Sequence, residues 1–110
     1  MQQKLGPVSS KFYEQESEMY KALAHPTRLR VLDLLHDRER AISELRQALN
    51  ISGPNLSQHL RILRVAGVLS TVRRERRVYC SCAFPEVTDL CRLARKLIRA
   101  QVHQQQRWAV

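Results

Sequence analysis

The sequence of 110 residues has few glycines, cysteines, aromatic residues and acidic residues. With three glycines in all, it contains no glycine-rich phosphate loop, and it has neither an HExxH metalloprotease motif nor a GxSxG nucleophile elbow. The histidines, cysteines and carboxylates are scattered along the chain and form no catalytic pattern. The sequence therefore gives no reason to expect an enzyme.

Long apolar runs are missing as well. The longest run extends from Val65 to Leu69, far short of the roughly 20 residues that a membrane-spanning helix needs. The first twenty residues lack the charged start and the apolar stretch of a secretory signal. Three cysteines, an odd number, argue against a disulfide framework and fit a reducing compartment. We therefore expect a cytoplasmic protein that does not enter a membrane.

Positive charge is abundant, and its excess over negative charge lies in the second half of the sequence. The chain has 19 Lys and Arg against 10 Asp and Glu, a net charge of +9. Residues 1–50 carry eight basic and seven acidic side chains, whereas residues 51–110 carry eleven basic ones, all but one of them arginine, and three acidic ones. Because guanidinium groups bind phosphates and guanine edges through paired hydrogen bonds, this half is predicted to bind nucleic acid. A basic face that only keeps the protein soluble is the alternative.

The spacing of apolar residues predicts one domain over residues 10–107, preceded by a flexible lead over residues 1–9. A first helix is expected from Ser10, a second over 26–35 with Pro26 in its first turn, and a loop over 36–40. A short third helix follows, and Asn50 is a suitable left-handed residue to end it.

The second half of the domain continues with a fourth helix that Ser52 caps and Gly67 ends. Two strands are predicted over 69–73 and 77–82, and a long last helix begins at Pro85. The resulting order, α-α-α-α-β-β-α, predicts a mainly α fold with a β-hairpin wing, which is a winged helix-turn-helix.

The connection over residues 50–53 is short, as in helix-turn-helix motifs that place their second helix in the major groove of DNA. The outward positions of the fourth helix are short or amide-bearing near its start, where side chains that pair with adenine are useful, and basic farther along, where phosphates lie. A helical hairpin with a solvated face is the alternative. The predicted contact residues are Gly53, Asn55, Ser57, Gln58, Arg61 and Arg64.

The predicted hairpin has the sequence RRERR at its tip, over residues 73–77. Four guanidinium groups in five positions repel one another unless an anion lies near. We therefore expect Arg73, Arg74, Arg76 and Arg77 to contact the DNA backbone or the minor groove. A charged tip that merely prevents the strand edge from pairing with other chains is the alternative.

The segment LAHPTRLRVL, together with S-x-P-x-L-S-Q-H-L-x-x-L-R-x-A-G-V-L from Ser52, resembles the ArsR/SmtB family of small winged-helix repressors over about residues 12–100. The resemblance implies a homodimer on an inverted DNA repeat, with an inducer or metal that weakens binding. It places Ser52, Asn55, Ser57, Gln58 and His59 on the recognition helix. The family interface uses the first and last helices, whose apolar faces here include Phe12, Tyr13, Met19, Tyr20, Leu90, Ala94, Leu97 and Ile98.

Two features depart from that family. Its wings commonly carry a glycine at the tip, where Arg76 is the nearest equivalent here, so we expect a tip that is wider or more mobile without DNA. The family's metal-binding Cys-x-Cys of the third helix is missing, because Ala41 and Ser43 occupy those positions.

The last helix offers an incomplete version of the family's second metal site. Asp89 and Cys91 occupy the positions of its first pair, Asp-x-His, but the later positions fall on Val102 and Gln105, with His103 one residue out of step. A shift of one residue rotates a side chain by about 100 degrees around the helix, so a tetrahedral zinc site is not expected. No cofactor is assigned, and a transition-metal ion at Asp89, Cys91 and His103 is left open.

The cysteines provide another candidate sensor. Cys80 and Cys82 point to the same face of a predicted strand, and Cys91 lies on the helix that folds back toward it. Three thiols could bind a thiophilic metal or form a redox disulfide, or they could simply be small buried apolar residues. The three histidines His25, His36 and His59 are interpreted as helix-end or surface residues.

Together these features predict a homodimeric winged-helix repressor of transcription that binds double-stranded DNA. Two alternatives stay open. The chain could be a protein-interaction module whose basic face meets an acidic partner, or a regulator without its own sensor site that relies on a partner protein for ligand sensing.

Overall fold

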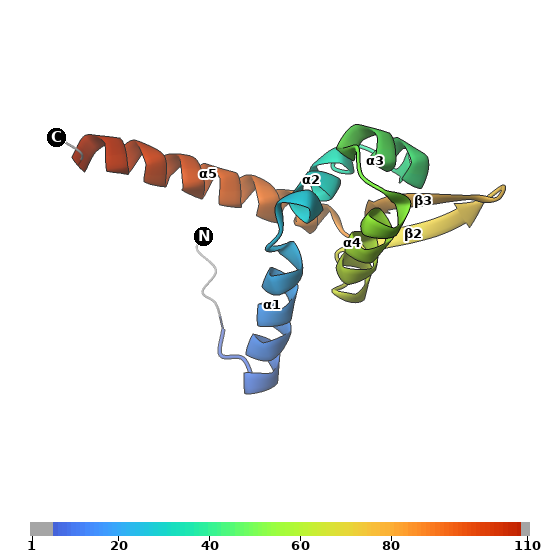
Figure 1. Ribbon diagram of the computed structural model, residues 1–110. Helices are drawn as coiled ribbons and strands as arrows, with labels where there is room; N and C mark the ends of the chain where they lie inside the picture. The colour runs from blue at the N-terminus through green and yellow to red at the C-terminus, as the bar shows by residue number, and fades with distance from the viewer. Residues whose placement is uncertain (1–5, 109–110) are drawn as a thin grey trace.

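The structure is a computed structural model that describes residues 6–108 (Figure 1). The predicted order of helices and hairpin is confirmed, with one added strand. Residues 1–5 of the predicted lead lie outside the described residues. The elements are α1 (Ser10–Leu23), α2 (Pro26–Leu34), β1 (Arg40–Ala41), α3 (Ile42–Leu49), α4 (Gly53–Val65), β2 (Leu69–Arg74), β3 (Arg77–Cys82) and α5 (Pro85–Trp108).

Strand β1 is the element that the sequence did not predict, since residues 36–40 were expected to form a loop. Its two residues pair antiparallel with β3, so that the sheet has the order β1-β3-β2. Arg40 lies opposite Cys80, and Ala41 lies opposite Tyr79. Two residues are too few to show an alternation of polar and apolar side chains, so only the partner strand defines this element.

Short polar side chains fix the ends of three helices, and two of them, Ser52 and Asn50, are in the expected places. The hydroxyl of Ser9 accepts a hydrogen bond from the Phe12 amide at the start of α1, and Ser52 accepts one from the Asn55 amide at the start of α4. Asn50 ends α3 in the left-handed conformation, with φ of 53°. The predicted cap and the predicted stop are thereby both confirmed, and they define the turn between α3 and α4.

The hydrophobic core lies beneath this helix-turn-helix. Leu45 of α3 and Leu56 and Leu63 of α4 are fully buried, together with Val31 of α2. Cys80 of β3 and Val87 of α5 complete the same cluster. Because three leucines of α4 point inward, the opposite side of this helix must face outward.

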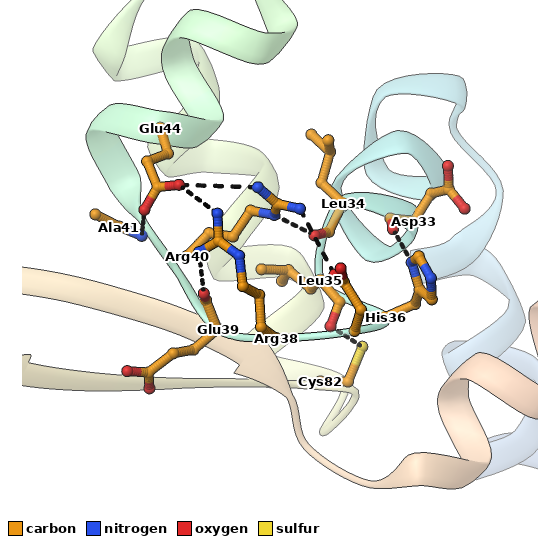
Figure 2. A network of polar contacts seen from close by, with 11 residues as sticks. Asp33, Leu34, Leu35, His36, Arg38, Glu39, Arg40, Ala41, Glu44 and Cys82 are labelled. Carbon is orange, nitrogen blue, oxygen red and sulfur yellow. Dashed lines mark hydrogen bonds and ion pairs between the residues drawn. The ribbon is translucent and has the colours of Figure 1, made fainter.

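A network of polar contacts fixes the start of α3 (Figure 2). The Glu44 carboxylate accepts a hydrogen bond from the Ala41 amide at 3.2 Å and pairs with Arg38 at 3.1 Å. The hydrogen bond from Ala41, more than the charge of Arg38, lowers the pKa of Glu44. Arg40 donates to the carbonyl oxygen of Leu34, which joins the end of α2 to this network.

Helices α1 and α5 extend away from this core in different directions (Figure 1). Helix α1 packs against α2 and α4, and α5 packs against α2 and β3. An ion pair of 2.7 Å between Arg95 and Asp33 joins α5 to α2. Beyond this contact, Leu97, Ile98 and Val102 are exposed. One protomer therefore leaves much of the apolar surface of α5 uncovered.

The tip of the wing is a tight turn. In the register of the hairpin, Arg74 of β2 lies opposite Arg77 of β3, so only Glu75 and Arg76 connect the two strands. Both residues have positive φ, 49° for Glu75 and 69° for Arg76, as a type I′ hairpin turn requires. The expectation of a wider tip is therefore wrong, because two ordinary residues adopt the left-handed conformation that glycine would take at less cost.

This turn provides a stability test. We expect Arg76→Gly to raise the free energy of unfolding by up to about 1 kcal/mol, because glycine adopts a positive φ without steric strain. Urea unfolding followed by circular dichroism measures the change. Arg76→Ala is the matched control, since it removes the same charge but keeps the Cβ atom. Equal midpoints for the two variants would show that the conformation of residue 76 is not strained.

Candidate nucleic-acid interface

The outer face of α4 carries most of the predicted contact residues. Asn55, Ser57 and Gln58 are exposed near the start of the helix, and Arg61 and Arg64 are exposed farther along. The buried leucines hold the other side of the helix against the core. The structure thus brings hydrogen-bonding side chains and two arginines together on one exposed surface, as the amphipathic pattern predicts.

The first two predicted residues shape the start of this helix. Ser52 is its N-cap, and its hydroxyl oxygen is occupied by the Asn55 amide. Gly53 is half-buried because the guanidinium group of Arg46 lies over it, with Cζ 3.6 Å from the position that a Cβ atom would take. Arg46, on α3, was not among the predicted contact residues.

The structure separates His59 from the exposed residues of α4. Its ring centroid lies 4.5 Å from that of His25, at the junction of α1 and α2. Its Nδ1 atom is buried and, within the described residues, has no hydrogen-bond partner. Burial first, and then the charges of His25 and Arg28, lower the pKa of His59. The interpretation of His59 as a surface residue is correct only in part, because the residue is half-buried and its Nδ1 atom faces the protein.

The other two histidines lie at helix ends, as expected. His25 caps α2 through Nδ1, which accepts a hydrogen bond from the Thr27 amide at 3.1 Å. His36 follows the end of α2, is exposed, and has its Nδ1 atom 2.7 Å from the Asp33 carbonyl oxygen.

The four wing arginines are exposed, but their surroundings differ. Arg74 pairs with Glu39, which raises the pKa of its guanidinium group, and lies 4.3 Å above the centroid of the Tyr79 ring. Arg77 donates to the Ser43 hydroxyl at 3.4 Å. Within residues 6–108, Arg73 and Arg76 form no ion pair. Arg74 therefore joins the wing to the residues before α3, while Arg73 and Arg76 point their charge to solvent.

The candidate metal ligands do not converge. Asp89 and Cys91 lie near the start of α5, whereas His103 is about 18 Å farther along the helix axis and is exposed. In the part of the chain that the structure describes, no three His, Cys, Asp or Glu side chains are grouped as metal ligands would be.

The three cysteines are free and pack against the core. Cys80 is fully buried, and burial raises its pKa to about 11. Burial also raises the pKa of Cys82 and of Cys91, both half-buried. The Cys82 thiol lies 3.8 Å from the carbonyl oxygen of Leu35 (Figure 2). A raised pKa keeps a thiol protonated, whereas the thiolate is the reactive form. Burial of the three cysteines therefore favours a structural role over a role as a sensor.

The predicted interface residues fall into two groups. Met19 and Leu90 are partly buried within the protomer, and Met19 packs against its core. The others are exposed on α1 and α5. These exposed residues are Phe12, Tyr13, Tyr20, Ala94, Leu97 and Ile98. Over the described residues, no helix has both the length and the apolar character that crossing a membrane requires.

Comparisons with known proteins agree with this geometry. A family model described as a helix-turn-helix domain matches residues 23–72. The uncharacterized HTH-type transcriptional regulator Rv0081 of Mycobacterium tuberculosis is 38% identical over 91 residues, which cover 82% of this chain and 80% of the relative. The transcriptional repressor SmtB of the same species is 36% identical over 72 residues, 66% of this chain and 53% of the relative.

Solved structures are similar over nearly the whole fold. The crystal structure of Rv0081 superposes with a TM-score of 0.81 at 36% identity, covering 88% of this chain and 98% of that one. A solution structure from Mycobacterium bovis, described as a homodimeric winged helix-turn-helix DNA-binding domain of a possible ArsR-family regulator, has a TM-score of 0.80 at 27% identity and covers 92% of this chain and 95% of that one. The chain belongs to the ArsR/SmtB family of winged helix-turn-helix transcriptional regulators.

Proposed function

We propose that this protein is a homodimeric repressor that binds an inverted repeat in double-stranded DNA and acts in the cytoplasm, without catalysis. The observation that carries the proposal is the outer face of α4, where amide, hydroxyl and guanidinium groups are exposed while the leucines of the same helix anchor it to the core. A helix of this kind fits the major groove, which is about 12 Å wide.

The side chains of α4 and the wing form two kinds of contact with DNA, to base edges and to backbone phosphates. Asn55 and Gln58 can each form two hydrogen bonds with adenine, and Ser57 accepts several bases. Arg61 and Arg64, farther along the helix, suit backbone phosphates, as do Arg73 and Arg76 on the wing. Contacts of the first kind give sequence preference, and contacts of the second kind give affinity that depends on salt.

The dimer follows from the apolar surface that one protomer leaves exposed. Leu97 and Ile98 of α5 are 60% and 56% exposed, and Phe12 of α1 is 50% exposed. A second copy that covers these faces would bring two α4 helices to the same side of the duplex. Two recognition helices about 34 Å apart then enter successive major grooves, which is why an inverted repeat is the proposed site. Residues 10–107 form the DNA-binding and dimerisation domain in this proposal.

The experiment is a selection of duplexes from a random pool, followed by fluorescence anisotropy on the selected and an unrelated duplex. We expect an inverted repeat, and we expect Gln58→Ala to reduce the preference for it by at least about 30-fold, because each of the two half-sites loses one pair of base contacts. Arg64→Ala is the control on the same helix, and should weaken both duplexes alike. Selection of no preferred sequence would contradict the proposal.

A further inference from the structure

A polar hollow of about 610 Å³ lies between α3 and the wing. Helix α3 packs alongside β3. Asn50 and Ile51, in the turn into α4, also line the hollow. Its α3 residues Ser43, Arg46 and Gln47 are not among the predicted contact residues. Its polar lining consists of Ser43, Glu44, Arg46, Gln47, Asn50 and Arg77.

The charge of this hollow is positive. Its one acidic residue, Glu44, is already paired with Arg38 and Arg40 and accepts a hydrogen bond from the Ala41 amide (Figure 2). Arg46 and Arg77, in contrast, form no ion pair with any residue of the described part of the chain. Two uncompensated guanidinium groups at one hollow attract an anion.

The hollow lies between the start of α4 and the wing, a position that favours a phosphate of the DNA backbone as the anion. The guanidinium group of Arg46 lies over Gly53, the first residue of α4, and Arg77 belongs to the wing. Arg46 and Arg77 thus line one hollow between the start of α4 and the wing, where a DNA strand that contacts both elements would pass. The side chains of Ser43 and Gln47 are exposed at the same place and supply uncharged hydrogen-bond donors.

We infer that this hollow binds a phosphodiester group of the DNA backbone, with Arg46 and Arg77 as its cationic ligands and Ser43 and Gln47 as hydrogen-bond donors. The inference rests on the proposed function and adds α3 to the DNA-binding surface. Arg46 carries no sequence information in this arrangement. It fixes the position of the duplex relative to the start of α4.

The test compares the full-length protein with Arg46→Gln, which keeps a polar side chain in place of the guanidinium group. One phosphate contact per protomer is lost, so we expect affinity for the selected and the unrelated duplex to fall about equally, by roughly 10- to 50-fold, and the slope of log K against log salt to fall by about two. Arg92→Gln on α5 is the matched control, because it removes the same charge and should leave the slope unchanged.

A second readout locates the phosphate. In a series of duplexes, each has one neutral methylphosphonate at a different position of the half-site. The unaltered protein should bind one of these duplexes less tightly, and Arg46→Gln should show no such loss of affinity for that duplex. If the unaltered protein binds with a normal salt slope and Arg46→Gln keeps both that slope and the methylphosphonate profile, the inference is overturned while the proposed function stands. If the unaltered protein binds no duplex at low salt, the proposed function is overturned.

Discussion

Leu97→Asp is expected to convert the protein from a dimer into a monomer without unfolding the protomer. Leu97 is 60% exposed on α5, so a carboxylate there meets water in the single chain. In a dimer through α5, the same carboxylate would be buried twice, once from each copy, and burying an unpaired charge costs several kcal/mol. We expect dimerisation to weaken by at least about 100-fold.

Loss of the dimer should also abolish tight DNA binding, because the second half-site contact then ceases to be intramolecular. Affinity for an inverted repeat should fall by about 10²- to 10⁴-fold. Sedimentation velocity at micromolar concentration gives the mass, and circular dichroism reports the fold. Lys96→Gln, which changes the charge by the same amount on another side of α5, is the control. A dimeric Leu97→Asp protein with unchanged affinity would show that α5 is not the interface.

The second large effect is expected from the wing. In the double variant Arg73→Ala and Arg76→Ala, each dimer loses four guanidinium groups that form no ion pair in the described part of the protomer. Each phosphate contact contributes about 0.9 to the salt slope, so the slope should decrease by about three to four, and affinity near 0.15 M salt should fall by roughly 10²- to 10³-fold. The loss should be similar for all DNA sequences, because phosphate contacts do not distinguish bases.

Anisotropy titrations over a range of salt concentrations test this expectation. Alanine at position 76 keeps the same strained φ as arginine, so the turn should not change. The double variant Arg92→Ala and Arg99→Ala removes the same total charge from α5 and should leave the slope nearly intact. A wing variant that changes sequence preference but not the salt slope would show that these arginines contact bases rather than phosphates.

The sequence predicted those parts of the fold that depend on neighbouring residues. Ser52 and Asn50 act through hydrogen bonds and dihedral angles within one turn, and the leucines of α4 repeat with the period of the helix. The ends of the strands are correct within one residue, since 69–73 and 77–82 were expected and the structure has Leu69–Arg74 and Arg77–Cys82.

The features that the sequence could not predict depend on distant parts of the chain. Glu39 and Arg74 pair although 35 positions separate them, and β1 exists only because β3 lies beside it. His59 is polar and lies next to Gln58 in sequence, but its ring contacts that of His25 and its Nδ1 atom is buried. The hollow containing Arg46 likewise requires α3 and the wing to be neighbours in space.

The contact between Arg74 and Glu39 has a consequence for how the wing meets DNA. Arg74 is held from two directions, by the Glu39 carboxylate and by the face of the Tyr79 ring. The Arg74 side chain is therefore fixed in the free protein, and part of the entropy of ordering this arm is already lost before a duplex binds. Preorganisation of this kind lowers the entropic cost of association, so the arm can contribute to binding even though Arg73 and Arg76 form no ion pair within residues 6–108 of the free protomer.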